Sequence, residues 1–312
     1  MTRRWLEIIQ SDYLDGYITE GGSAIKFVII SGTRARADLA AALNGTANVQ
    51  GLLPISLDAR STKLHFIQLL FHELARQIDW TDLASNYLKE CLRKLDISDS
   101  VQFPLDLEEL SRAAGRARSL LADQLYSFLR SDLVDDPAMS REFKATFLTL
   151  CLGQIQQNDG PASPHAPVVI RWLRGELVSL PELKAAGIFQ RVARHNARFL
   201  LASLAHMVRK CGYRGMFLSL DICRYLESNR FAARVSGNYY TPAAVVDLYE
   251  MLRQLVDEQG AWEGVFAVVW APPELTSDPA RGLDRYQALK MRLVDDVRAR
   301  SHPNLLAPLV RF

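Results

Sequence analysis

A short loop between a predicted strand and a predicted helix carries residues that could contact a phosphate group. It runs from Ile30 to Ala37 and its sequence is ISGTRARA. In a phosphate-binding loop, glycines let successive N–H groups surround the phosphate, a lysine adds positive charge and a Ser or Thr hydroxyl binds magnesium. Here Gly32 is out of register, Arg36 stands at the lysine position and Ala37 at the hydroxyl position. The loop therefore predicts a degenerate nucleotide site in which Gly32 and Arg36 are the remaining candidates.

A strand-terminal acid is the second candidate of this site. The apolar stretch MFLSLDIC, residues 216–223, contains Asp221 where a nucleotide hydrolase holds magnesium through water. The next residue is Ile222, where a glutamate would activate the attacking water. We therefore predict that the chain does not hydrolyse nucleotide efficiently. Three alternatives stay open: ATP with magnesium held weakly by Arg36 and Asp221, no cofactor at all, and Asp221 as a residue that only caps a turn.

Two groups of arginines are candidates for contacts with other molecules. Arg191, Arg194 and Arg198 have the spacing of one helical face within a predicted helix over 188–211. Such a face suits the phosphate backbone of DNA, an acidic partner protein, or plain solvation. Arg292, in a looser group with Arg281 and Arg285, could reach the nucleotide of a neighbouring subunit. Its alternative is a salt bridge to Asp295 or Asp296.

Alternation of apolar strands and amphipathic helices predicts the elements that position these residues. The predicted strands are 25–31, 51–58, 215–223 and 264–271, and Pro54 favours an edge position for the second. The predicted helices around them are 3–18, 34–44, 188–211, 242–258 and 283–299. This order predicts an α/β fold with a parallel sheet. We assign residues 1–60 and 188–312 to the α/β core, and residues 61–187 to a helical insertion or subdomain.

Composition narrows the class of protein. The 312 residues carry a net charge of +2, so no strong overall field attracts nucleic acid. The four cysteines form no C-x-x-C pair, which favours reduced thiols and argues against a zinc site. A run of about 18 apolar residues, as a membrane span needs, is missing. We expect a cytoplasmic protein with no membrane partner and no metal site.

Five stretches of the chain together are similar to one family. They are residues 12–29, 62–80, 211–224, 239–258 and 282–293, beginning DYLDGYITEGG, TKLHFIQLL, CGYRGMFLS, YYTPAAVV and GLDRYQAL. In this order they resemble the BREX-associated ATP-binding proteins of the BrxC/BrxD type, which are P-loop ATPases of the AAA+ class from bacterial phage-defence operons. The resemblance implies an AAA+-like P-loop NTPase core with a large helical insertion, working with other phage-defence subunits.

The functional prediction depends on three positions at which this sequence differs from that family. They are Arg36, Ala37 and Ile222, where a lysine, a Ser or Thr, and a glutamate would stand. We predict a non-catalytic AAA+-like subunit of a BREX-type complex that acts in assembly, regulation or DNA-associated recognition. One alternative is an ATPase that binds and hydrolyses ATP together with a partner subunit. Another alternative is a DNA-binding module.

Overall fold

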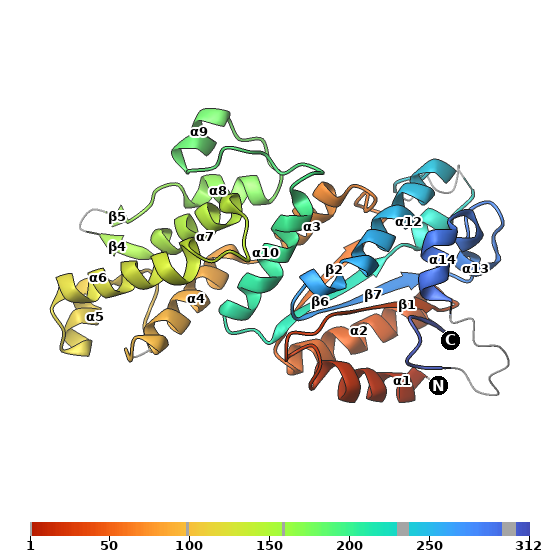
Figure 1. Ribbon diagram of the computed structural model, residues 1–312, viewed down its shortest axis with the longest axis horizontal. Coiled ribbons are helices and arrows are strands. Elements are labelled where there is room, and N and C mark those ends of the chain that lie inside the picture. The colour runs from red at the N-terminus through yellow and green to blue at the C-terminus, as the bar shows by residue number, and fades with distance from the viewer. Residues whose placement is uncertain (1, 98–99, 158–159, 230–236, 295–303) are drawn as a thin grey trace. The chain divides into compact units, whose positions relative to one another are not determined.

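The structure is a computed structural model that describes residues 2–97, 100–157, 160–229, 237–294 and 304–312 (Figure 1). The chain divides into two compact units. The first unit comprises Met1–Leu74 and Tyr213–Phe312, and the second comprises Ala75–Gly212. The second unit is thus inserted between the two parts of the chain that form the first.

A five-stranded parallel sheet forms the centre of the first unit. Its strands are β1 (Ala24–Ile29), β2 (Leu52–Asp58), β6 (Gly215–Asp221), β7 (Val265–Ala271) and β8 (Leu309–Arg311). They lie in the order β2-β6-β7-β1-β8, and every neighbouring pair is parallel. All seven residues of β7 are buried, as expected for a strand covered on both faces. The predicted α/β fold with a parallel sheet is confirmed, and β2 lies at an edge, as Pro54 indicated.

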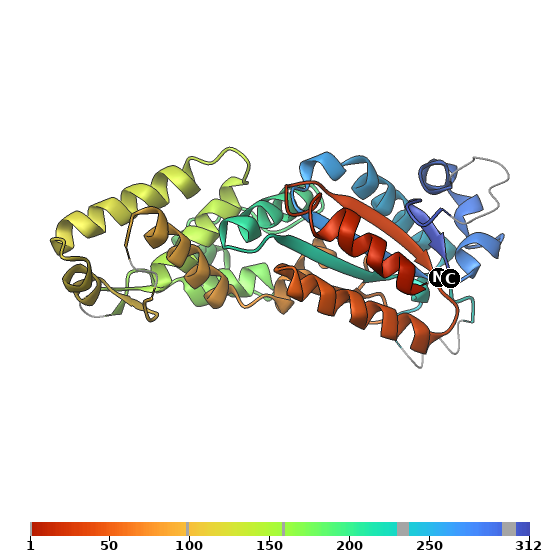
Figure 2. The same ribbon diagram turned by 90° about the horizontal axis from the view of Figure 1, so that it is seen from below.

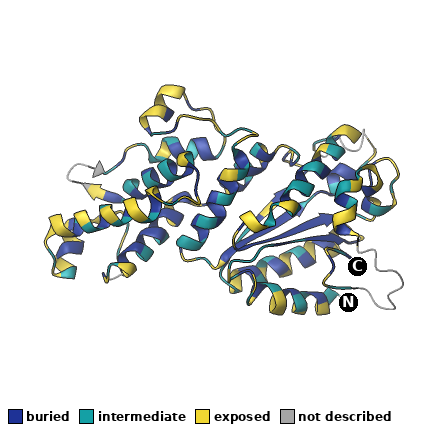
Figure 3. Cartoon of the chain, viewed as in Figure 1, coloured by how far each residue is buried: buried dark blue, intermediate teal, exposed yellow. Residues whose placement is uncertain are grey.

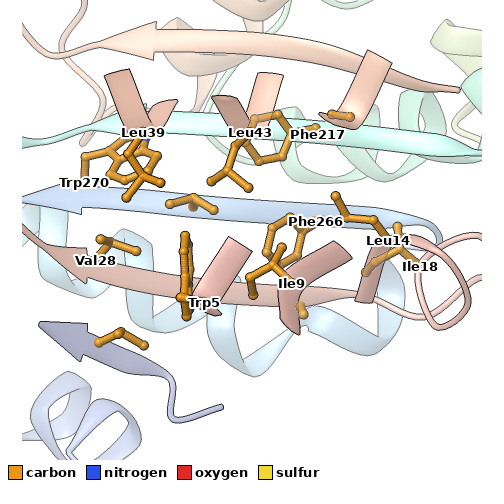
Figure 4. Close-up of a cluster of buried hydrophobic side chains, with 14 of the residues drawn as sticks. Trp5, Ile9, Leu14, Ile18, Val28, Leu39, Leu43, Phe217, Phe266 and Trp270 are labelled. Atoms are coloured by element: carbon orange, nitrogen blue, oxygen red, sulfur yellow. The ribbon is translucent and has the colours of Figure 1, made fainter. Parts of the chain in front are cut away.

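Three helical segments cover one face of this sheet (Figure 2). They are α1 (Thr2–Ile8), η1 (Ile9–Leu14) and α2 (Thr33–Val49). Trp5 and Ile9 from the first two segments and Leu39 and Leu43 from α2 point onto the strands (Figure 4). The matching side chains of the sheet include Val28, Phe217, Phe266 and Trp270. Burial of this cluster fixes α2, and with it the residues at the start of α2, against the sheet.

Further helices of the first unit follow β2, β6 and β7. They are α3 (Ile67–Gln77), η3 (Cys223–Leu226), α12 (Pro242–Asp257), η4 (Gln259–Ala261), α13 (Glu274–Ser277), η5 (Leu283–Arg285) and α14 (Gln287–Leu293). The boundary between the units falls within α3. The predicted helix over 283–299 is in fact η5 and α14, and its positions 295–299 lie outside the described residues.

The second unit is mainly helical. Its helices are α4 (Trp80–Lys94), α5 (Leu107–Ala114), α6 (Arg118–Leu129), η2 (Arg130–Val134), α7 (Arg141–Gly153), α8 (Ala166–Leu173), α9 (Leu180–Ala185) and α10 (Ala197–Lys210). A small sheet joins β3 (Leu105–Asp106), β4 (Ile155–Gln157) and β5 (Gly160–Pro161). Throughout the described part of the chain, each helix is too short or too polar to cross a membrane.

A charged network ties α10 to η2 in this second unit. Lys210 donates hydrogen bonds to the Asp132 carbonyl oxygen and to Asp136 Oδ2, both at 2.5 Å, and His206 Nε2 lies 3.0 Å from the same Asp136 oxygen. Burial raises the pKa of Asp136, but the hydrogen bonds from Lys210, the Ala138 N–H and His206 outweigh it and lower the pKa to about 2. Lys210 therefore has a structural role.

Candidate nucleotide-position site

An α/β protein with an open parallel sheet binds ligands at the carboxyl ends of its strands. The binding crevice lies where the order of the strands reverses, so that the connections from two adjacent strands run to opposite sides. Asp58 at the end of β2 lies beside Asp221 at the end of β6. Asp221 in turn lies beside Trp270 of β7. A pocket of about 280 Å³ opens here. It is lined by Thr33, Arg36, Ala37, Ala40, Ser56, Leu57, Asp58, Arg60, Ser219, Asp221 and Trp270.

The structure brings together Arg36 and Asp221, two of the residues selected from the sequence. Arg36 is in the first turns of α2, and its Nε atom lies 3.0 Å from Asp221 Oδ2. The Arg36 side chain is 10% exposed and that of Asp221 is 26% exposed. The other carboxylate oxygen of Asp221 accepts the backbone N–H of Cys223 at 2.9 Å. Both oxygens of Asp221 are thus engaged within the chain, and the ion pair spans the wall of the pocket.

Gly32 marks how short the connection between β1 and α2 is. β1 ends at Ile29 and α2 begins at Thr33, so residues 30–32 alone form the loop. Gly32 is the N-cap with φ 86°, a backbone conformation that favours glycine, and its carbonyl accepts the N–H of Arg36 at 3.3 Å. A phosphate cradle needs several successive N–H groups in a loop that curves around the anion. Here the helix has already begun at those positions.

These residues do not fit ATP with magnesium. Ala37 has no side-chain oxygen for the metal, and the Asp221 carboxylate that would hold it is paired with Arg36. The hydroxyl of Ser219 already accepts the indole N–H of Trp270 at 2.8 Å. The pocket of about 280 Å³ is also just below the range of about 300–1,000 Å³ typical of small-molecule sites. In the described part of the chain, no cluster of His, Cys, Asp and Glu could hold a metal ion.

Sequence reasoning selected Asp221 but missed other residues of the pocket wall, among them Asp58, Arg60 and Trp270. Asp58 Oδ1 accepts the backbone N–H of Arg60 at 2.7 Å. An acid at the end of each of two apolar stretches was the available signal, because parallel strands end at the same edge of a sheet. Two arginines and two aspartates line the pocket, so its charged residues balance, which does not favour a polyanion.

Arg292 lies at the opposite edge of the sheet. It belongs to α14 and lines a second pocket, of about 590 Å³, together with Ser23, Ala24 and Lys26 at the start of β1. Its guanidinium binds both carboxylate oxygens of Asp257 in α12, one of them at 2.8 Å. This arginine therefore has an acidic partner inside the chain. The alternative partners Asp295 and Asp296 lie outside the described residues.

Lys26 is the buried cation of this second pocket. Its side chain is packed on the Tyr13 ring, and its amine donates to the Leu306 carbonyl oxygen at 2.5 Å. Burial lowers the pKa of Lys26 to about 8. The contact fastens the segment that leads into β8 to β1, so we assign Lys26 a structural role.

Arg281, which the sequence analysis grouped with Arg292, is buried and has a structural role. Its Nη1 atom donates to the carbonyl oxygens of Tyr225 and Tyr240, at 2.8 and 2.9 Å, and Nη2 donates to the Tyr239 hydroxyl at 2.9 Å. It thereby joins three segments beside the sheet. Arg285, by contrast, is exposed.

The predicted helix over 188–211 is wrong in its first third, and this changes the arginine surface. α10 begins only at Ala197, so Arg191 and Arg194 lie in the preceding loop and do not share a helical face with Arg198. The reason is local hydrogen bonding. The Asn196 side chain accepts the N–H of Ala193 at 2.8 Å and donates to the Arg191 carbonyl oxygen at 3.0 Å, which holds a turn in place of a helix.

Comparison with family models found one description that fits this architecture. The model of the BREX system ATP-binding protein BrxC/D matches residues 132–312, which is more than half of the chain. The matched part contains β6, β7 and β8, but not β1, α2 or the loop between them. No curated protein matches the chain, and no solved structure does. The chain therefore belongs to the BREX system ATP-binding protein BrxC/D family, which implies a role in BREX phage defence.

Proposed function

We propose that this chain is a non-catalytic, AAA+-like subunit of a BREX phage-defence complex. The observation that carries the proposal is the ion pair of Arg36 with Asp221 at 3.0 Å, at the sheet edge where a related ATPase would hold phosphate and magnesium. The pair engages with each other the two charged groups that a nucleotide with magnesium would need. Because each charged group already has its partner within the chain, neither needs a nucleotide to balance its charge. This arrangement suits a structural or regulatory subunit of a complex.

The residues at the positions of the hydrolytic groups also support this proposal, because they cannot perform hydrolysis. Activation of water requires a base beside Asp221, and that position holds Ile222, which is buried. Stabilisation of the transferred phosphoryl group requires a flexible cation aimed at the phosphate, whereas Arg36 is directed at a carboxylate. Each missing group alone would lower the rate by orders of magnitude.

The role in the complex follows from the family. Other BREX proteins are the expected partners of this chain. We propose that it contributes to their assembly or regulation. Its α/β core supplies a rigid platform, since the central strands are buried and covered by helices.

Release of phosphate from MgATP tests the proposal. We expect the purified chain to release no phosphate above the protein-free background, both alone and after mixing with the purified proteins of its own BREX system that lack ATPase activity themselves. Turnover that Asp221→Ala abolishes would contradict the proposal. Turnover that appears only in the mixture, and disappears with Arg36→Ala, would instead establish an ATPase completed by a partner subunit.

A further inference from the structure

A segment of the second unit between α8 and α10 presents large apolar side chains to solvent. Leu177 is 86% exposed, Leu180 is 50% exposed and Phe189 is 55% exposed. Figure 3 shows α9, which Leu180 begins, with much of its surface exposed. Single apolar residues are common on protein surfaces, but three within thirteen positions of one folded segment favour an interaction surface.

The fold holds these side chains outward. Ser179 and Glu182 form a reciprocal capping box at the start of α9. Leu183 and Ile188 are buried beneath the segment. Because its ends and interior are fixed, the exposure of Leu177 and Phe189 is a property of the folded segment.

Hydrogen bonds also connect the part of the segment after α9, which carries Phe189 and Arg191, to α8 and to the part before α9. Trp172 Nε1 donates to the Gln190 carbonyl oxygen at 3.1 Å, and Arg191 Nη2 donates to the Val178 carbonyl oxygen at 3.4 Å. The second bond brings the backbone next to Leu177 against the part that carries Phe189 and Arg191. Leu177 and Phe189 are therefore each within two residues of this contact.

Positive charge accompanies the apolar side chains. Arg191 and Arg194 are exposed, and neither has a carboxylate partner among the residues that the structure describes. The acids of the segment, Glu176 and Glu182, lie 4.0 Å from Arg171. We define the α9 surface as Leu177, Leu180, Phe189, Arg191 and Arg194. Phe and Arg are enriched at protein–protein interfaces, and grouped exposed apolar side chains mark interaction sites.

We propose that the α9 surface docks another protein of the same BREX system. The docked segment of that protein would carry apolar side chains surrounded by carboxylates. This inference rests on the proposed role as a subunit. Nucleic acid fits the surface less well. Two of its three exposed apolar side chains are leucines, which neither stack on bases as aromatic residues do nor donate to phosphate.

Site-specific crosslinking in cells that carry the complete BREX operon tests this proposal. A photo-crosslinking amino acid replaces Leu177 or Phe189, with Val49 as the control position because it is 84% exposed in the other unit. We expect crosslinks from positions 177 and 189 to one BREX protein, at a segment that combines apolar residues with Asp or Glu. Position 49 should give none to that segment.

Charge reversal supplies the matched control. Arg191→Glu with Arg194→Glu should lower the crosslinked fraction about tenfold, which corresponds to about 1.4 kcal/mol of binding. Arg112→Glu with Arg130→Glu, at two other exposed arginines of the same unit, should leave it unchanged. Crosslinks to DNA, equal crosslinking from position 49, or none from 177 and 189 would overturn the proposal. Continued co-purification with BREX proteins in that event would leave the proposed function intact.

Discussion

Replacing Asp221 with alanine is expected to lower the free energy of unfolding by about 2–3 kcal/mol. The Arg36 side chain is 10% exposed and has its ion pair with Asp221 at 3.0 Å. Removal of one partner of a buried pair leaves an uncompensated charge, which costs about 3–5 kcal/mol when both groups are fully buried. Because Asp221 is 26% exposed, we expect an effect just below that range. Urea unfolding followed by circular dichroism measures it.

The double variant and a neighbouring acid sharpen this experiment. Arg36→Met combined with Asp221→Ala should recover most of the loss, since no charge then remains buried. Asp58→Ala, at the adjacent strand end, removes only the hydrogen bond to the Arg60 N–H and should cost about 1 kcal/mol. A loss from Asp221→Ala below about 0.5 kcal/mol, as for an ordinary surface substitution, would contradict a structural ion pair. It would favour a free carboxylate kept for a ligand.

Replacing Arg281 with methionine is expected to cost about 3 kcal/mol of stability. Methionine preserves much of the apolar volume but removes the hydrogen bonds to the carbonyl oxygens of Tyr225 and Tyr240 and to the Tyr239 hydroxyl. Arg281 is 4% exposed, so water cannot readily replace the lost donors. The same urea unfolding experiment provides the measurement.

Arg285→Met is the control for Arg281 because Arg285 is exposed four residues further along the chain. It should change stability by no more than about 0.5 kcal/mol. Equal effects of the two substitutions would refute the structural role of Arg281. Loss of an activity of the complex with no loss of stability in Arg281→Met would point instead to a contact with a neighbouring subunit.

The sheet could be predicted from the sequence because buried parallel strands are continuous apolar runs. Residues 25–31, 51–58, 215–223 and 264–271 correspond to β1, β2, β6 and β7 within two residues at each end. β8 was missed as a strand, because a three-residue edge strand has too few residues for a recognisable pattern. The start of α10 was missed because a side chain, that of Asn196, decides the backbone conformation before it.

The site could be predicted only in part, for a reason of geometry. Its spacing along the chain puts Arg36 at the position of the lysine in a phosphate-binding loop. In the folded chain, Arg36 instead forms an ion pair with Asp221. The length of the loop could not be obtained from the residues alone, because Thr33 and Arg34 suit a loop and the first turn of a helix equally well. Arg292, by contrast, lies away from this site. The sequence does not reveal that Arg292 of α14 lies near the start of β1, at the amino edge of the sheet.

Calorimetric titration of the purified chain with MgATP tests the central claim most directly. Because Arg36 and Asp221 are paired with each other at the nucleotide position, we predict no binding heat and no change of melting temperature at a ligand concentration of about 1 mM. Saturable binding with a Kd below about 100 μM, weakened at least tenfold by Arg36→Ala, would contradict the account. In that case the ion pair would open for a nucleotide, and the chain would be an ATP-binding protein in its own right.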